Sequence, residues 1–385
     1  MYMLKLIFRN AFRHKLRTCL TILGITIAIL AFGILRTLVN AWYSGVEASS
    51  SARLITRNAI SLVFSLPLSY KEKIRGIPGV KNVSYAIWFN GTYISEKNFI
   101  PNFAIDPKTF LELYPEYTLP EDQKVAFFRD RMAAVAGRKV AERFSWKIGD
   151  TIPLKGTNFP GTWNFILRGI YHGAEKSTDE TQLFFHWDYL NESLKKTTPN
   201  RADQVGIYII GITNPNLAPE VSEAVDKTFK NSLAETMTET EKAFQLSFVS
   251  MTEAIVTVIQ LVSFMVIIII IAVVANTMVM TARERIGEYA IMKTLGFGGW
   301  HLAILIFGES LFITMVGCTL GILLTFPSAK IFGAKIGAYF PVFHVSTNTI
   351  FLDIGAAILV SLIAAIFPTW HAVKIRVAEG LRRIG

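Results

Sequence analysis

Four long apolar stretches divide the chain. They lie near residues 18–40, 254–282, 302–326 and 348–370. A helix rises about 1.5 Å per residue, so about 20 apolar residues are enough to cross the hydrocarbon core of a bilayer. The pattern therefore predicts four transmembrane helices. Because the apolar run of the first is too long for the core of a signal peptide, we expect it to stay in the mature protein.

A polar region of about 210 residues separates the first two predicted spans and is punctuated by turn sequences. Alternating or apolar runs at 163–171 and 204–212 predict strands, whereas 137–144 and 218–235 predict helices. A mixed α+β domain of this size can bury a core of its own. Residues 232–260 contain neither proline nor glycine, which predicts either one helix continuous with the second span or two helices with a break near residue 250.

Composition agrees with a membrane protein, since 51% of the residues are hydrophobic and the mean hydropathy is +0.39. The net charge of +10 is concentrated at the ends of the predicted spans. The basic residues there are Lys5, Arg9, Arg13, Lys15, Arg17, Arg283, Arg285, Lys293, Lys374, Arg376, Arg382 and Arg383. The loop between the third and fourth spans has only Lys330 and Lys335. The positive-inside rule therefore places both termini and the 283–300 segment in the cytoplasm, and nucleic-acid binding is not expected.

Together these patterns predict nine segments along the chain. They are a basic cytoplasmic helix at 1–17, a span at 18–43, an extracytoplasmic α+β domain with a stalk at 44–250, a span at 251–282, a cytoplasmic helix and turn at 283–300, a span at 301–326, a short outer loop at 327–347, a span at 348–370 and a cytoplasmic tail at 371–385.

The sequence offers little that could carry catalysis. It lacks the G-x-x-x-x-G-K-[ST] phosphate loop and the H-E-x-x-H, G-x-S-x-G and C-x-x-C motifs. Its two cysteines, Cys19 and Cys318, both fall in predicted spans, so the polar region has no disulfide. His172 and His186 flank two acidic residues, but their spacing fits no zinc pattern. We therefore expect no catalytic residue, no metal site and no cofactor bound by this chain.

Ionisable residues inside spans are costly and need a reason. Arg36 and Asp353 lie near the outer ends of their spans, where their side chains can reach the interface. Glu309 is deeper, about two turns into the third span, so it must be neutral, paired or facing a polar groove. A packing role and a direct role in transport both remain open for it. Gly317 and Gly321 form a G-x-x-x-G motif that fits self-association or packing inside one bundle.

The segment "RERIGEYAIMKTLGF", residues 283–297, is charged and amphipathic and directly follows the second span. Read as a helix, it places Ile286 and Ala290 on one side, with Lys293 close to that side. Arg285, Glu288 and Met292 point elsewhere, and Gly296 ends the helix. Its mixed charge favours a protein partner over an anionic lipid surface. A helix that merely connects two spans along the membrane surface is the alternative.

Four stretches resemble, in the right order, the MacB/FtsX superfamily of ABC permeases. They are "LIFRNAFRHKLRTCLTILGITIAI" at 6–29, "AAVAGRKVAERFSWKIGDTIPLKG" at 133–156, "ARERIGEYAIMKTLGF" with "HLAILIFGESL" at 282–311, and "FPTWHAVKIRVAEGLRR" at 367–383. The third contains the Leu295-Gly296 pair and the Glu309 that the family carries.

The resemblance implies an α-helical membrane protein with four transmembrane helices and a MacB-like α+β extracytoplasmic (periplasmic) domain between the first and second. It also implies that residues 283–296 form a coupling helix, which docks on a separate ATPase subunit that binds ATP and magnesium. The residues concerned are Arg283, Glu284, Arg285, Ile286, Glu288, Lys293, Leu295 and Gly296.

By the same resemblance, the chain is not itself an enzyme. It pairs with a second permease, identical or related, in a bacterial inner membrane, and exports or extracts an amphiphile such as a lipid, lipoprotein, peptide or drug. A periplasmic adaptor protein, an outer-membrane exit duct and membrane lipids are expected partners. The alternative is an FtsX-like regulator that activates a cell-wall hydrolase without transport.

Overall fold

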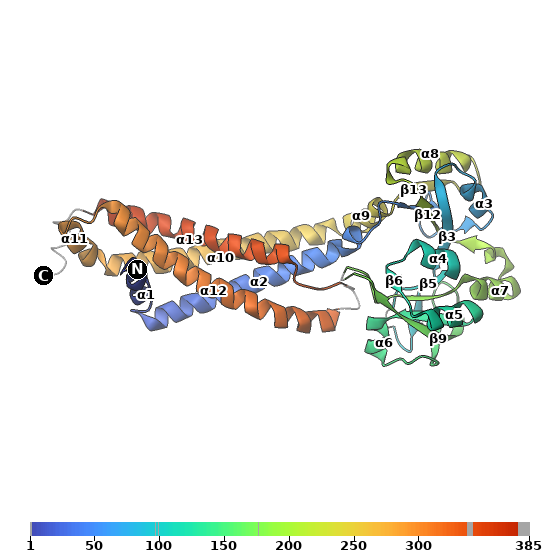
Figure 1. Cartoon of the computed structure of the whole chain (residues 1–385), viewed down its shortest axis with the longest axis horizontal. Coiled ribbons are helices and arrows are strands. Elements are labelled where there is room, and N and C mark those ends of the chain that lie inside the picture. Colours follow the sequence, from blue (N-terminus) through green and yellow to red (C-terminus); the bar gives the residue numbers. More distant parts are fainter. Residues whose placement is uncertain (1, 97, 99, 176, 337–341, 376–385) are drawn as a thin grey trace. The chain divides into compact units, whose positions relative to one another are not determined.

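The computed structural model describes residues 2–96, 98, 100–175, 177–336 and 342–375 (Figure 1). Contacts divide these residues into two compact units. The helical unit contains residues 2–41, 252–336 and 343–375, and the α/β domain contains residues 42–251 with Val342. Each unit has a hydrophobic core of its own and is described separately.

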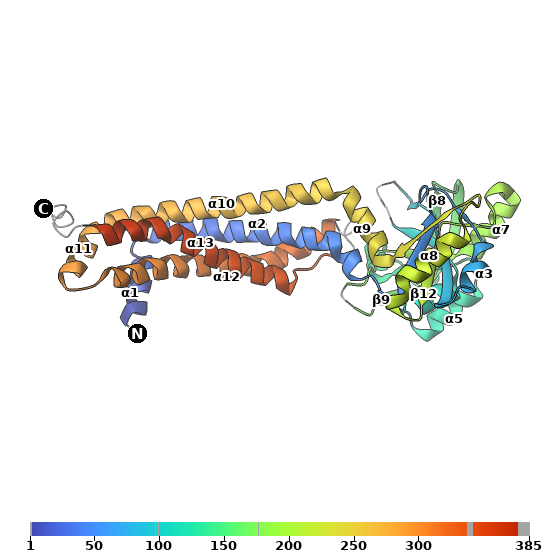
Figure 2. The same cartoon turned by 90° about the horizontal axis from the view of Figure 1, so that it is seen from above.

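The helical unit is built on four long helices that lie side by side (Figures 1 and 2). They are α2 (Lys15–Glu47), α10 (Glu253–Glu284), α12 (Gly299–Ile336) and α13 (Thr347–Lys374). Among the described residues, these four are the helices long and apolar enough to cross a membrane. Two short helices, α1 (Tyr2–Ala11) and α11 (Ile286–Thr294), lie at one end of the unit. Helix α12 continues through Pro327 to Ile336, past residue 326, where the sequence predicts the span to end.

Small residues let two helices of the bundle approach closely. A Cβ atom at Gly317 would lie 2.7 Å from Ile25 Cγ2, and one at Gly321 would lie 2.7 Å from Ile29 Cβ. Contacts this short leave no room for a side chain at either glycine. The backbone of α12 therefore packs directly against isoleucine side chains of α2. The G-x-x-x-G motif thus packs inside one bundle.

A mixed sheet forms the centre of the α/β domain, with strand order β13-β1-β12-β3-β5-β10-β7-β9-β8-β4 among the described residues. Neighbouring strands are antiparallel except for the parallel pairs β5–β10 and β7–β9. The strands are β1 (Arg53–Asn58), β3 (Val80–Trp88), β4 (Gly91–Tyr93), β5 (Asn102–Ile105), β7 (Ala133–Gly137), β8 (Thr151–Gly156), β9 (Gly161–Gly173), β10 (Leu183–His186), β12 (Ile207–Ile212) and β13 (Thr236–Thr240), with β6 (Tyr117–Thr118) pairing β9 and a separate pair β2 (Leu66–Pro67) and β11 (Gln204–Val205).

Helices cover both faces of this sheet, because successive strand residues point to opposite sides. Leu54 of β1 belongs to one buried cluster and the next residue, Ile55, to another on the opposite face. The helices are α3 (Tyr70–Arg75), α4 (Pro107–Leu113), α5 (Glu121–Arg129), α6 (Arg138–Phe144), α7 (Trp187–Thr197), α8 (Ala218–Thr228) and α9 (Glu241–Met251), with short 3₁₀ turns at Pro199–Arg201 and Pro215–Leu217.

The predicted strand at 163–171 and helix at 137–144 are confirmed by β9 and α6, whereas the predicted helix at 218–235 ends early, at Thr228. Residues 236–240, which the sequence predicts as helical, are strand β13 instead. The reason is tertiary: this segment pairs with β1, and the hydroxyls of Thr56 and Thr238 lie 2.9 Å apart. A break at Thr252 then separates α9 from α10, so the two-helix alternative holds.

The histidine-containing cluster in the domain has structural partners. The His186 ring nitrogen Nε2 lies 2.7 Å from the Phe127 carbonyl oxygen, and Glu180 accepts a 2.7 Å hydrogen bond from Arg138. Burial lowers the pKa of His186, which keeps the ring neutral. No group of metal-ligating side chains occurs in the described part of the chain.

Candidate functional site

The segment between α10 and α12, residues 283–300, forms a tight turn around α11, and we call it the α11 hairpin. Ile286, Tyr289 and Ala290 of α11 are buried, and Tyr289 packs in one cluster with Leu302 and Ala365 of the neighbouring helices. Ile286 and Ala290 therefore share a buried side, as their spacing predicts. Gly296, with φ +91°, closes the helix while its backbone N–H donates to the Lys293 carbonyl oxygen.

Arg285 is buried on the same side, contrary to its predicted position on another face. Its Nη1 donates to Glu309 Oε2 across 2.9 Å, and the two side chains are only 6% and 5% exposed. Its Nε also donates to Glu288 Oε2 at 3.1 Å. Glu309 is thus paired, which accounts for a carboxylate so deep in the third span. Removing Arg285 would leave the buried carboxylate of Glu309 without its cation, and removing Glu309 would leave Arg285 with Glu288 alone.

Nearby charges keep both ends of this network ionised. Burial alone would lower the pKa of Arg285, but the adjacent Tyr289, Glu309 and Glu288 outweigh it and raise the pKa above its ordinary value. Burial alone would raise the pKa of Glu288, but hydrogen bonds from Arg13 and Arg285 hold that pKa below its ordinary value. The α11 hairpin therefore carries a fixed pattern of charge at neutral pH.

Further ion pairs join the hairpin to the N-terminal part of the chain. Glu284 accepts hydrogen bonds from Arg17 of α2 at 2.6 and 2.9 Å, and it also lies 3.4 Å from the His14 ring. Glu288 accepts a hydrogen bond from Arg13, in the turn between α1 and α2. Two acidic residues that the sequence assigns to a partner are therefore bonded within the chain.

Lys293 joins the hairpin to the last span. Its Nζ donates to the backbone carbonyl oxygens of Val373 and Ile375, at 2.6 and 2.9 Å. These carbonyls lie at the C-terminal end of α13, where a cation compensates both the unpaired oxygens and the helix dipole. Side chains of the hairpin thus bond to α2, α12 and α13.

Four large apolar side chains of the hairpin are exposed. Leu295 is 72% and Trp300 75% exposed, and Ile291 and Phe297 are also exposed. We call these four residues the crest. Of the predicted coupling residues, Leu295, Gly296 and Arg283 are exposed, whereas Ile286 and Arg285 are buried. Sequence reasoning missed Ile291, Phe297 and Trp300, although two large aromatic residues in so short a loop between spans are an available signal.

Asp353 corrects a second expectation from the sequence. It is 1% exposed and lies inside the helical unit, so its side chain packs within the bundle and does not extend along the bundle surface. A Cβ atom at Gly33 of α2 would lie 3.3 Å from Asp353 Oδ2 and 3.1 Å from Thr325 Oγ1, which places both side chains against α2. Within the described residues neither carboxylate oxygen has a hydrogen-bond partner.

Two protein-family models match the chain. The model described as MacB-like periplasmic core domain matches residues 18–228, and the model described as FtsX-like permease C-terminal matches residues 260–377. The chain is also 24% identical over 399 residues to an uncharacterized ABC transporter permease of Methanocaldococcus jannaschii, covering 97% of this chain and 96% of the relative.

Two solved structures are similar to the α/β domain at low identity. The periplasmic region of MacB from Actinobacillus actinomycetemcomitans is 10% identical, covering 53% of this chain and 95% of its own, with a TM-score of 0.39. The extracellular domain of the noncanonic ABC-type transporter YknZ from Gram-positive bacteria is 10% identical, covering 49% and 99%, with a TM-score of 0.36.

Proposed function

Because this chain belongs to the MacB/FtsX-type family of ABC transporter permeases, we propose that it couples ATP hydrolysis by a separate ATPase subunit to transport on the far side of the membrane. Membership of an ABC transporter family implies an ATPase partner. The sequence has no phosphate-binding loop of its own, which supports assigning ATP and magnesium to that partner and treating the chain as a non-enzymatic subunit.

The single observation that carries the proposal is that the α11 hairpin combines bonded charged side chains with exposed apolar ones. Its charged side chains Glu284, Arg285 and Lys293 bond to α2, α12 and α13, while its crest of Ile291, Leu295, Phe297 and Trp300 is exposed. A docking element needs both properties: an exposed apolar surface for the partner and rigid connections that carry the partner's movement into the spans. Residues that merely connect two spans need neither.

The remaining parts of the proposal rest on the resemblance to the family. Two copies of the permease, identical or related, each place a crest on one of two ATPases in an inner membrane, with both termini in the cytoplasm. Closure of the ATPases moves the hairpins, and the movement passes along α10 to the joint at Thr252 and on to α9. The substrate is an amphiphile such as a lipid, lipoprotein, peptide or drug. It is taken up outside the membrane and passed to an adaptor and exit duct.

Co-purification tests the proposal. The tagged chain is extracted from its own membranes in mild detergent, its companions are identified, and ATP hydrolysis is measured in the same sample. We expect an ATPase at about one copy per copy of this chain, with hydrolysis, and an adaptor as the third protein. A cell-wall hydrolase as the third protein would replace transport by regulation. A solitary and inert chain would contradict the coupling role.

A further inference from the structure

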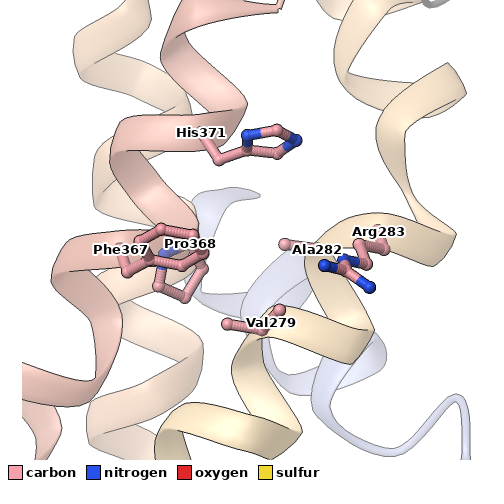
Figure 3. A pocket seen from close by; sticks show the side chains of 6 residues that line it. All are labelled: Val279, Ala282, Arg283, Phe367, Pro368 and His371. Carbon is pink, nitrogen blue, oxygen red and sulfur yellow. The ribbon is translucent and has the colours of Figure 1, made fainter.

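A small pocket lies beside the α11 hairpin, between the ends of α10 and α13, and the proposed coupling does not use it. It is lined by Val279, Ala282 and Arg283 of α10 and by Phe367, Pro368 and His371 of α13 (Figure 3). We call it the Arg283 pocket. Its volume of about 40 Å³ is far below the 300 Å³ or more of sites that enclose a small molecule. The pocket therefore suits one small polar group and not a transported substrate.

The polar groups of the pocket are both nitrogen donors. Figure 3 shows the His371 ring extending from α13 toward α10, and Arg283 lies on α10, across the pocket from His371. Either neutral form of the imidazole has one N–H, and the guanidinium has several. Among the described residues, no carboxylate lines the pocket. This donor set fits an anion.

Arg283 differs from its charged neighbours in having no acidic partner within the described residues. The adjacent Glu284 is paired with Arg17, and Arg285 is paired with Glu309. Arg283 itself is exposed and makes no ion pair with any described residue. Its positive charge is therefore available to a ligand, unlike the charges of the other predicted coupling residues.

The rest of the pocket is apolar and continues into the surface of two spans. Phe367 of the pocket is 56% exposed, and Met280 of α10 and Ile366 of α13 are 52% and 58% exposed. Because α10 and α13 are both apolar enough to span a membrane and both end here, the pocket lies where hydrocarbon meets the headgroups.

Trp370 and Lys374 form a further pair at the same end of α13. Trp370 is 54% exposed, and Lys374 Nζ lies 4.2 Å from the centre of its ring. Tryptophan and snorkelling lysine are typical of the membrane interface. Basic pockets between transmembrane helices bind the headgroups of anionic lipids.

We propose that the Arg283 pocket binds the phosphate of an anionic phospholipid, whose acyl chains lie along Phe367 and the exposed apolar residues of α10 and α13. The phosphate accepts hydrogen bonds from Arg283 and His371 and so bridges the ends of two helices beside the α11 hairpin. The lipid belongs to the leaflet that meets this end of the helical unit. The proposed site therefore does not depend on which way the chain is oriented in the membrane.

Native mass spectrometry of the full chain in mild detergent tests the lipid site. The chain is titrated with phosphatidylglycerol or phosphatidylcholine, and bound lipid is counted. We expect phosphatidylglycerol to bind at least about tenfold more tightly, and Arg283→Gln to remove about tenfold of that affinity, as loss of a charge-assisted hydrogen bond predicts. His371→Gln should weaken binding less, and Arg283→Lys should keep most of the preference.

Arg9→Gln is the matched control, because Arg9 is an exposed basic residue of α1 at the same end of the helical unit. It should leave phosphatidylglycerol binding unchanged. An equal loss in Arg9→Gln, or no loss in Arg283→Gln, would overturn the site. Displacement of the lipid by inorganic phosphate would reduce it to a free-anion site, and displacement by the purified ATPase subunit would assign Arg283 to that interface. If Arg283→Gln elutes as aggregate, His371→Gln and Arg283→Lys still decide the question.

Discussion

At the scale of residues, the buried Arg285–Glu309 pair matters because it joins the α11 hairpin to a transmembrane helix. Both side chains are almost fully buried, and their atoms meet at 2.9 Å. In such a pair the cost of removing water from two charges is offset only while both partners are present. The pair therefore holds the hairpin in place without necessarily adding net stability.

The burial of this pair predicts that Glu309→Gln lowers the free energy of unfolding of the detergent-solubilised chain by up to about 3–5 kcal/mol, because the buried guanidinium of Arg285 keeps only the more exposed Glu288 as an acidic partner. Adding Arg285→Met in the same chain should recover most of the loss. The control is Glu192→Gln, which removes one partner of an ion pair whose side chains are 55% and 44% exposed and should cost less than about 1 kcal/mol. If Glu309→Gln and Glu192→Gln lowered the free energy of unfolding equally, the buried pair would matter no more to stability than an exposed one.

The sequence predicted which residues matter here better than it predicted what they contact. The depth of Glu309 predicts that it is neutral, paired or facing a polar groove, and nothing in the order of residues selects Arg285 as its partner over Arg283 or Lys293. The choice is made by the tight turn between α10 and α11, which points Arg285 inward while Arg283 stays exposed. Asp353 was misjudged for a similar reason, because only the packed bundle shows α2 covering it.

At the scale of elements, the contact between α2 and α12 is set by two glycines one helical turn apart. A methyl group at Gly321 would meet Ile29 Cβ at 2.7 Å and the Thr26 carbonyl oxygen at 3.0 Å. Since atoms do not approach so closely, the two helices would have to separate.

We therefore predict that Gly321→Ala destabilises the chain by about 1–3 kcal/mol, measured by thermal or denaturant unfolding in detergent. Gly355→Ala in α13 is the matched control, because a Cβ atom there meets nothing within 4 Å. It should be neutral or slightly stabilising, since alanine favours the helix over glycine. A Gly321→Ala variant as stable as Gly355→Ala would contradict the close packing of α2 on α12.

Spans were easier to predict than strands for a physical reason. A run of about 20 consecutive apolar residues suits a membrane span far better than a surface helix or a strand, so α2, α10, α12 and α13 follow from local composition. Strand β13 does not, because its threonines favour a strand while Met237 and Glu239 suit a helix, and the strand with which it pairs, β1, lies about 180 residues earlier in the chain. The break at Thr252 was also hard to predict, because no proline or glycine occurs near it in the sequence.

At the scale of the whole molecule, the central claim is that the crest of the α11 hairpin binds a separate ATPase. The crest lies on a segment whose charges are mostly paired within the chain, so apolar contact and not charge pairing is the expected basis of docking. Reversing charge at Arg285 or Glu288 would test the wrong surface, because it would break the connections to α12 and to the turn that precedes α2.

The most direct measurement compares Leu295→Asp with Leu233→Asp in the tagged chain, recording the ATPase recovered per chain and the hydrolysis rate. Both leucines are exposed, at 72% and 108%, but Leu233 belongs to the α/β domain. A charge buried in an apolar interface is costly, so we expect Leu295→Asp to lower recovery and hydrolysis at least about tenfold while Leu233→Asp matches the unmodified chain. Full recovery and full hydrolysis with Leu295→Asp would contradict docking through the crest.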